Sequence, residues 1–127
     1  MSIRIKEIAF TAYPVTDVAR ARAFYGQTLG LKETMAHEFD ASMWWIEYDI
    51  GAGTLALTNY TKPAADHGGP NIAFEVEDLD AAIADLKAKG VKIVECCPGT
   101  TVMDCPTCRF FFIADPDGNG INIHQRK

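Results

Sequence analysis

The sequence predicts an α+β domain made of two similar modules, each consisting of a strand, a helix and three further strands. Apolar residues recur at helical spacing after Asp17 and again after Asp78, and each aspartate suits a helix N-cap. Asp78 follows Asp17 by 61 positions, which indicates a repeat of the whole unit. Near the end of the chain, Ile121 and Ile123 alternate with polar residues, the period of a half-buried strand.

The first module is expected to start with a strand over residues 8–15 that runs into the Asp17 cap. We expect the helix to end at Gly26 or Gly30, because glycine favours helix termination. Its buried side should carry Val18, Ala21, Phe24, Tyr25 and Leu29. Three strands should follow, with a tight turn at 51–53 joining the last two, over residues 31–38, 43–49 and 54–58.

The second module repeats this order. A strand over 71–76 should run into the Asp78 cap, and Gly90 stands where the helix should end. The helical stripe consists of Leu79, Ala82, Ile83 and Leu86. The following strands are expected at 91–95, 109–113 and 120–124. The whole chain, 1–127, is then one domain, with module one at 1–60, a linker at 61–69 and module two at 70–127.

Composition limits the possible functions. With 127 residues, 48% hydrophobic and 23% charged, the chain can build one real core. A net charge of −5 and a pI near 5.1 argue against a nucleic-acid partner, which would need a basic face. We find no apolar run of the length that a signal peptide or a membrane span needs. We therefore expect a cytoplasmic protein without a membrane partner, with its cysteines reduced.

Several motifs carry a family resemblance that covers nearly the whole chain. They are the segments 14–17 (PVTD), 23–25 (AFY), 29–31 (LGL), 73–79 (AFEVEDL) and 115–119 (DPDGN). With two such modules, the chain resembles the vicinal oxygen chelate superfamily, which includes glyoxalase I, extradiol dioxygenases and fosfomycin and bleomycin resistance proteins. The resemblance implies curled mixed sheets around an open cup, and a homodimer. It leaves open whether a cup is built within one chain or across the dimer.

In metal-using relatives, the resemblance implies, four strand positions aim His, Glu or Gln at one divalent ion. In this sequence those positions fall on Phe10, Ala56, Asn71 and Asn122. Phenylalanine and alanine have no ligand atom, and the neutral amide of asparagine is a poor ligand for Zn, Ni or Fe. We therefore expect no metal and no cofactor in the cup.

The same positions instead predict an apolar, amide-lined binding site for a small organic molecule. The residues expected to line it are Phe10, Ala56, Asn71, Asn122, His124, Trp44, Trp45, Tyr48 and Cys108. Strand alternation separates Trp44 and Tyr48 from Trp45, so only one tryptophan should reach the cup, and the sequence does not say which.

Two residues are candidates for acid–base chemistry. His124 should share a strand face with Asn122, and Glu47 could act as a base or as the counter-charge of a cationic ligand. His37 is expected to be solvated, and His67 lies in the linker. Whether any reaction is catalysed stays open, and so does the identity of the ligand.

Three alternatives remain. One is a metal-dependent lyase, isomerase or dioxygenase of the glyoxalase type with displaced ligands such as Glu47, His67 or His124. Another is a structural dimer with an inert cup. The third is redox or zinc chemistry at the cysteines, which are Cys96, Cys97, Cys105 and Cys108. Because the C-x-x-C segment 105–108 leads into a strand rather than a helix, reduced thiols are the expectation.

Overall fold

The computed structural model describes residues 3–4, 6–59, 62–63, 71–95 and 97–127. Its first module contains a short α-helix that continues as a π-helix. The elements are β1 (Thr11–Pro14), α1 (Val18–Arg22), the π-helix η1 (Ala23–Thr28), β2 (Glu33–Asp40), β3 (Met43–Ile50) and β4 (Gly53–Thr58).

The second module has the same order of strands and helix. Its elements are β5 (Ile72–Glu75), α2 (Leu79–Ala88), β6 (Met103–Asp104), β7 (Cys108–Ala114) and β8 (Gly120–Arg126). No helix among the described residues is long and apolar enough to cross a membrane.

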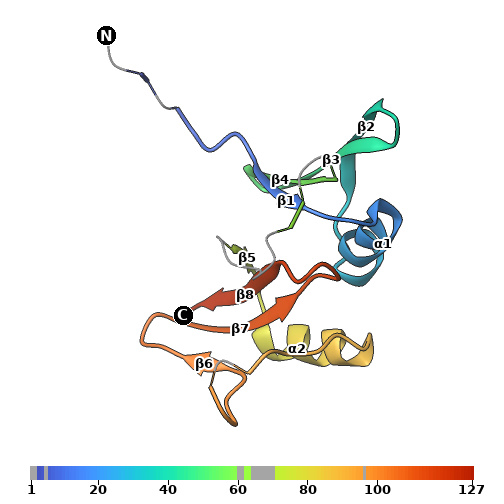
Figure 1. Cartoon of the computed structure of the whole chain (residues 1–127). Helices are drawn as coiled ribbons and strands as arrows, with labels where there is room; N and C mark the ends of the chain where they lie inside the picture. The colour runs from blue at the N-terminus through green and yellow to red at the C-terminus, as the bar shows by residue number, and fades with distance from the viewer. Residues whose placement is uncertain (1–2, 5, 60–61, 64–70, 96) are drawn as a thin grey trace.

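Each module forms one four-stranded mixed sheet, with the orders β1-β4-β3-β2 and β5-β8-β7-β6. In both, the first strand pairs in parallel with the last, and the other pairs are antiparallel. The two sheets follow one another along the length of the molecule, with α1 and α2 on the same side (Figure 1). The predicted α+β fold of two β-α-β-β-β modules is therefore confirmed.

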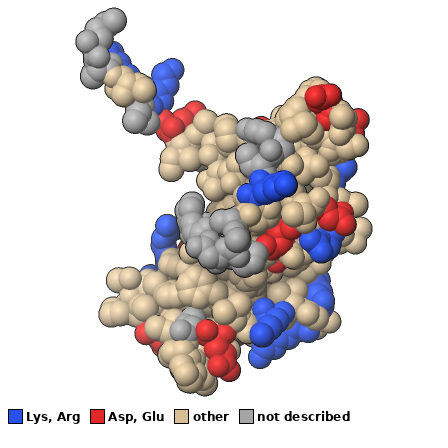
Figure 2. Space-filling model, in the orientation of Figure 1, with Lys and Arg blue, Asp and Glu red and all other residues tan. Residues whose placement is uncertain are grey.

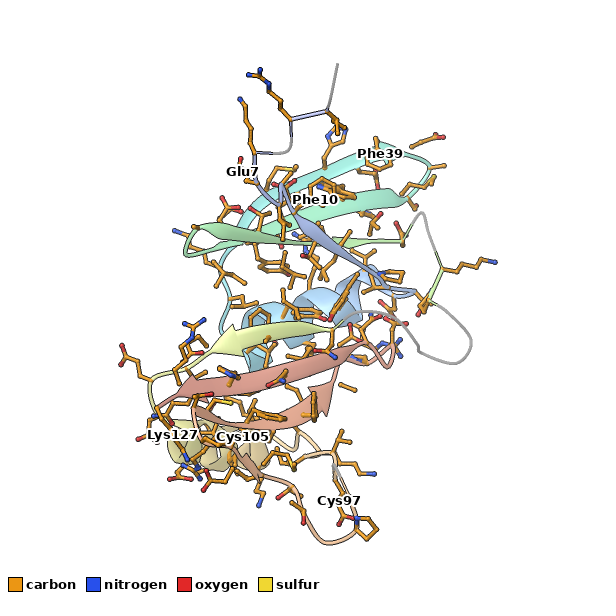
Figure 3. All side chains as sticks on the ribbon, turned by 90° about the vertical axis from the view of Figure 1, so that its left-hand side faces the viewer. Glu7, Phe10, Phe39, Cys97, Cys105 and Lys127 are labelled. Carbon is orange, nitrogen blue, oxygen red and sulfur yellow. The ribbon has the colours of Figure 1, made fainter. Side chains whose placement is uncertain are left out.

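One face of each sheet packs into a core shared by the modules. Strand residues of this core face include Leu55 and Ile46 in the first sheet and Ile121 and Phe111 in the second. Because side chains alternate along a strand, the residues between them point to the other side. We call that other side of each sheet its open face; Figure 3 looks onto it.

A hydrogen-bonded latch joins the modules beside the predicted 115–118 turn. The Asp115 carboxylate, 5% exposed, accepts a 2.8 Å bond from the Tyr25 hydroxyl of η1. The Asn119 amide donates to the Pro14 carbonyl at 2.9 Å, and the Tyr13 hydroxyl donates to the Gly120 carbonyl at 2.7 Å. Each of these hydrogen bonds joins a residue of the first module to a residue of the second. The latch therefore fixes the position of one module relative to the other.

One element prediction was wrong. No strand forms over 91–95, where only Val94 makes an isolated bridge to Phe112; the edge of the second sheet is β6 instead. The first helix begins after the predicted Asp17 cap and ends before Gly30, as expected, and it continues as the π-helix η1 after Arg22. Most of the expected linker 61–69, including His67, lies outside the described residues.

Candidate functional site

The open face of the first sheet carries an aromatic pair beside a carboxylate. Phe10, just before β1, meets the Trp45 ring edge-on, with centroids 4.9 Å apart. The Trp45 indole Nε1 donates a 2.7 Å hydrogen bond to Glu47 Oε2, which holds both side chains on this face. Ala56 stands opposite Glu47 in the neighbouring strand and is fully buried. Phe10 is 47% exposed and is seen at the upper sheet in Figure 3.

The open face of the second sheet carries a polar group built on β5 and β8. Parallel pairing sets Ala73 beside Asn122 and Glu75 beside His124. His124 Nδ1 lies 2.6 Å from Glu75 Oε1, while Glu75 Oε2 accepts the backbone N–H of Arg126 at 2.7 Å. That N–H, together with His124, lowers the pKa of the Glu75 carboxyl. The carboxylate is therefore charged at neutral pH and fixed by both of its oxygens.

Asn122 contributes a buried acceptor without a partner. Its Oδ1 makes no hydrogen bond to the described part of the chain, although it is shielded from solvent. A buried carbonyl oxygen left unpaired costs about 1–3 kcal/mol. Such an atom requires an explanation, and a bound donor is one of them.

Phe110 and Phe112 form the aromatic wall next to this group. Phe110 is the antiparallel neighbour of His124, and the two rings are nearly parallel, 16° apart in plane and 6.4 Å between centroids. Phe112 is the neighbour of Asn122 and meets Phe110 edge-on. Sequence reasoning missed Glu75, Phe110 and Phe112. Glu75 comes beside His124 only through the parallel pairing of β5 with β8, which the 61-residue repeat does not specify.

Tyr48 and Trp44 do not lie on the open face, contrary to their inclusion among the site residues. Tyr48 is fully buried in the shared core, with its ring 6.1 Å from that of Tyr25. Trp44 packs against the same core, and the Arg22 guanidinium lies 5.5 Å from its ring centroid. The alternation of β3 therefore selects Trp45 as the tryptophan of the open face.

The remaining predicted site residues fall at the margins. Asn71 is exposed just before β5, with its Cβ next to Gly120. Cys108 begins β7 and is a free thiol, as are Cys105 and Cys97; Cys96 lies outside the described residues. Figure 3 shows Cys97 and Cys105 at the far end of the lower sheet from Phe10. His37 is exposed on edge strand β2, with its ring 5.5 Å from that of Phe39.

A cavity of about 500 Å³ lies between the modules. Its lining includes Thr11 and Leu55 from the first module and Ile72 and Ala73 from the second. Thr11 and Leu55 belong to the core side of their strands, so Phe10 and Ala56, their neighbours in sequence, point away from this space. On the first sheet the cavity and the open face are thus separate candidates for a ligand, whereas Ala73, which lies beside Asn122, gives the cavity a contact with β5 of the second sheet.

The described residues do not offer a metal site of the usual kind. No group of three or more His, Cys, Asp or Glu side chains among them is placed to hold an ion. The four positions implied by the resemblance hold Phe10, Ala56, Asn71 and Asn122, of which only the two amides have a donor atom. This donor set does not fit a divalent transition metal.

The protein surface carries both signs of charge. Acidic and basic side chains are interspersed over the face of the molecule seen in Figure 2. Ion pairs include Arg109 with Asp80 at 3.0 Å, and Arg22 with Glu33, which is partly buried, at 2.7 Å. No broad basic patch dominates that view, in line with the net charge of −5.

Comparison with known proteins identifies the family. The chain is 27% identical to the uncharacterized protein YaeR of Escherichia coli (strain K12), over 96% of this chain and 98% of that one. Its structure resembles TnmS3, an antibiotic binding protein from Streptomyces sp. CB03234, at 23% identity and a TM-score of 0.79, covering 99% and 100% of the chains. A putative glyoxalase family protein from Bacillus anthracis matches at 25% identity and 0.74, covering 100% of both.

The family model agrees with these likenesses and with the two-module architecture. It matches residues 7–123, which include both sheets up to the middle of β8. The chain therefore belongs to the Glyoxalase/Bleomycin resistance protein/Dioxygenase superfamily.

Proposed function

We propose that this protein binds a small, largely apolar organic molecule on the open faces of its sheets, without a metal ion. The observation that carries the proposal is the buried, unpartnered Oδ1 of Asn122. A ligand that donates one hydrogen bond to this atom, once the Asn122 side chain turns toward it, relieves its desolvation cost, so the site favours a molecule with a hydroxyl or N–H group.

The aromatic side chains supply the apolar part of the contact. Phe10 and Trp45 present ring surface on the first sheet, and Phe110 and Phe112 do so on the second. A mostly apolar wall with a few polar groups is the usual composition of a small-molecule site. The donor set at the family's metal positions supports a metal-free mode of binding, because Phe10 and Ala56 cannot ligate an ion.

A ligand screen monitored by intrinsic tryptophan fluorescence tests the proposal. Antibiotics belong in the screen because TnmS3, of the same fold, is described as an antibiotic binding protein. For any hit, Asn122→Leu should weaken binding about fivefold, the equivalent of one hydrogen bond of about 1 kcal/mol. Phe10→Ala should also weaken it, through lost ring contact.

The matched control is Gln27→Leu, which makes a similar amide-to-aliphatic change at an exposed position of η1. It should leave the affinity unchanged. If hits bind equally well to Asn122→Leu, Phe10→Ala and the control, the open faces are not the site. The cavity between the modules would then replace them.

Elemental analysis tests the metal-free part. Protein purified without chelators and dialysed should hold no stoichiometric divalent metal. One Zn, Ni, Mn or Fe per chain, lost in Glu47→Gln or His124→Gln, would favour the metal-dependent lyase, isomerase or dioxygenase instead.

A further inference from the structure

A smaller cavity, of about 230 Å³, lies where η1 of the first module approaches α2 of the second. We call it the η1–α2 cavity. Leu29 follows η1 and Leu86 belongs to α2, while Phe74 of β5 and Ile123 of β8 complete the lining from the core side of the second sheet. The cavity therefore has walls from both modules and does not lie on an open face.

The interior of this cavity is apolar and not filled by the chain. Leu86 and Ile123 are 5% and 4% exposed, whereas Leu29, Leu31 and Phe74 are only half-buried. An apolar cavity of about 150 Å³ lined by Leu, Ile and Phe stays dry and binds benzene. A cavity of about 230 Å³ with the same kinds of residue has room for one aromatic ring and a short substituent.

The polar end of the cavity is built around a lysine that bridges the modules. Lys89 Nζ donates to the Thr28 carbonyl of η1 at 3.0 Å and lies 2.9 Å from Asp85 Oδ2 of α2. Thr28 and Asp85 both line the cavity. The other acidic residue of the lining, Glu75, already has both oxygens in hydrogen bonds. Within the described residues Asp85 Oδ1 has no such bond, so it is the acceptor left for a ligand.

The charges at this end favour a neutral ligand that brings a hydrogen-bond donor. An anion would face the carboxylates of Asp85 and Glu75, and a cation would face the ammonium group of Lys89. A carboxylate accepts hydrogen bonds and does not donate them, so the donor must come from the ligand. A hydroxyl group on a short chain supplies it while a ring occupies the apolar interior.

We propose that the η1–α2 cavity is a second binding site of this protein, for a small neutral aromatic alcohol. The ring lies beside Phe74 and Leu86, and the hydroxyl group donates to Asp85 Oδ1. This site is independent of the proposed function, because the aromatic side chains and the Asn122 amide of the open faces do not line the η1–α2 cavity.

NMR with 2-phenylethanol as the probe tests the location. Nuclear Overhauser effects should connect its ring protons with the methyl groups of Leu86 and Ile123. These two residues line the η1–α2 cavity and not the larger cavity between the modules, whereas Leu55 and Ile72 line the larger cavity and not this one.

Three analogues of the probe test the ligand class. Ethylbenzene, which lacks the hydroxyl group, should bind about fivefold more weakly than 2-phenylethanol, the equivalent of one hydrogen bond of about 1 kcal/mol. Phenylacetate carries a negative charge and protonated 2-phenylethylamine a positive one. Both should bind more weakly than the alcohol, because each places a like charge at the polar end of the cavity.

Ala82→Leu tests the site by filling it. Ala82 is a half-buried residue of α2 that lines the cavity, so the larger side chain should take the place of the ring and weaken binding at least tenfold. Ala84→Leu makes the same change at an exposed position of α2 and should leave the affinity unchanged. Circular dichroism checks the folding of both variants. Asp85→Ala changes an exposed side chain and should lower the affinity for 2-phenylethanol to that for ethylbenzene.

Each contrary result overturns a stated part of the proposal. Unchanged affinity in a folded Ala82→Leu, or ring contacts with Leu55 and Ile72, would overturn the site. If ethylbenzene or either charged analogue binds as tightly as the alcohol, or if Asp85→Ala binds the alcohol normally, the ligand class is wrong. If none of the four compounds binds at millimolar concentration, both parts are overturned. The open faces are decided separately by Asn122→Leu and Phe10→Ala.

Discussion

At the scale of single residues, two buried tyrosine hydroxyls differ sharply in their surroundings. Tyr25 donates to Asp115, whose other bonds come from the backbone N–H groups of Asp117 and Asn119 and from the Asn119 side chain. The hydroxyl of Tyr48 is equally buried but has no hydrogen-bond partner among the described residues. The same deletion of one oxygen should therefore have opposite consequences at the two positions.

Tyr25→Phe should lower the free energy of unfolding by about 1–3 kcal/mol, because it removes a hydrogen bond to a buried carboxylate. Tyr48→Phe should change it by less than about 0.5 kcal/mol or stabilise the protein, since no bond is lost. Urea unfolding followed by circular dichroism gives both values. Equal losses in the two variants would mean that the latch between the modules contributes nothing specific.

The raised pKa values of the buried tyrosines predict that the folded protein loses stability at alkaline pH. Burial and then the charge of Asp115 raise the pKa of Tyr25, and burial raises the pKa of Tyr48 and Tyr13. The unfolded chain loses these protons near pH 10 while the folded protein keeps them. The stability from these groups is therefore fully present below pH 10 and falls above it, by at most about 1.4 kcal/mol per pH unit for each tyrosine.

Urea midpoints measured between pH 8 and 11 check this expectation. The slope above pH 10 should become shallower in Tyr25→Phe, because phenylalanine has no proton to lose. A slope identical to that of the wild-type protein would show that Tyr25 does not keep its proton preferentially in the folded state.

At the scale of elements, the repeat places one aspartate at the start of each helix. Asp17 accepts from the Arg20 N–H and Asp78 from the Ala81 N–H, both at 3.0 Å. The caps are thus equivalent, although the helices differ: α1 has five residues before it widens into η1, and α2 has ten. The N-cap depends only on residues next to it in the sequence. The length and the type of the helix that follows depend on what packs against it.

Asp17→Ala and Asp78→Ala should each lower the free energy of unfolding by about 1 kcal/mol, the usual cost of losing an N-cap. Asp17→Asn and Asp78→Asn are the controls and should cost less, because asparagine retains the accepting oxygen. The measurement is again urea unfolding. A neutral alanine variant in either module would contradict the equivalence of the caps.

At the scale of the whole molecule, apolar side chains remain in solvent at one end. The N-terminal segment projects away from the body of the chain (Figure 1), and Ile3 and Ile8 on it are 86% and 82% exposed. Phe39 is about half exposed on the same module. Exposed apolar surface of this kind is typical of an interface, and we propose that a second copy of the chain covers it.

Sedimentation equilibrium at micromolar concentration should show a homodimer of the 13.9 kDa chain. Ile8→Asp should shift it toward monomer, because a charge buried in an interface is costly. The control Lys6→Asp changes charge on the same segment without removing apolar area and should leave more dimer than Ile8→Asp. A wild-type protein that sediments only as the single chain would refute the dimer.

The sequence alone determined the elements whose signals are local. The Asp17 and Asp78 caps, the glycine at the end of each helix and the period of two in β8 depend on neighbours within a few residues. The 61-residue repeat added the equivalence of the two modules. From these, the fold class and the sharing of one face by Asn122 and His124 could be predicted.

Only the tertiary structure decided which face of each strand is buried and which distant residues meet. Strand alternation by itself does not say which of Trp44 and Trp45 points to the core. In the structure Ile46 and Tyr48 are buried in the core, and Trp44, on the same face of β3, packs against it. The edge strand of the second sheet is β6 and not the predicted strand at 91–95, because strand pairing depends on long-range contacts. The contact between Glu75 and His124, 49 residues apart, likewise exists only once β5 lies beside β8.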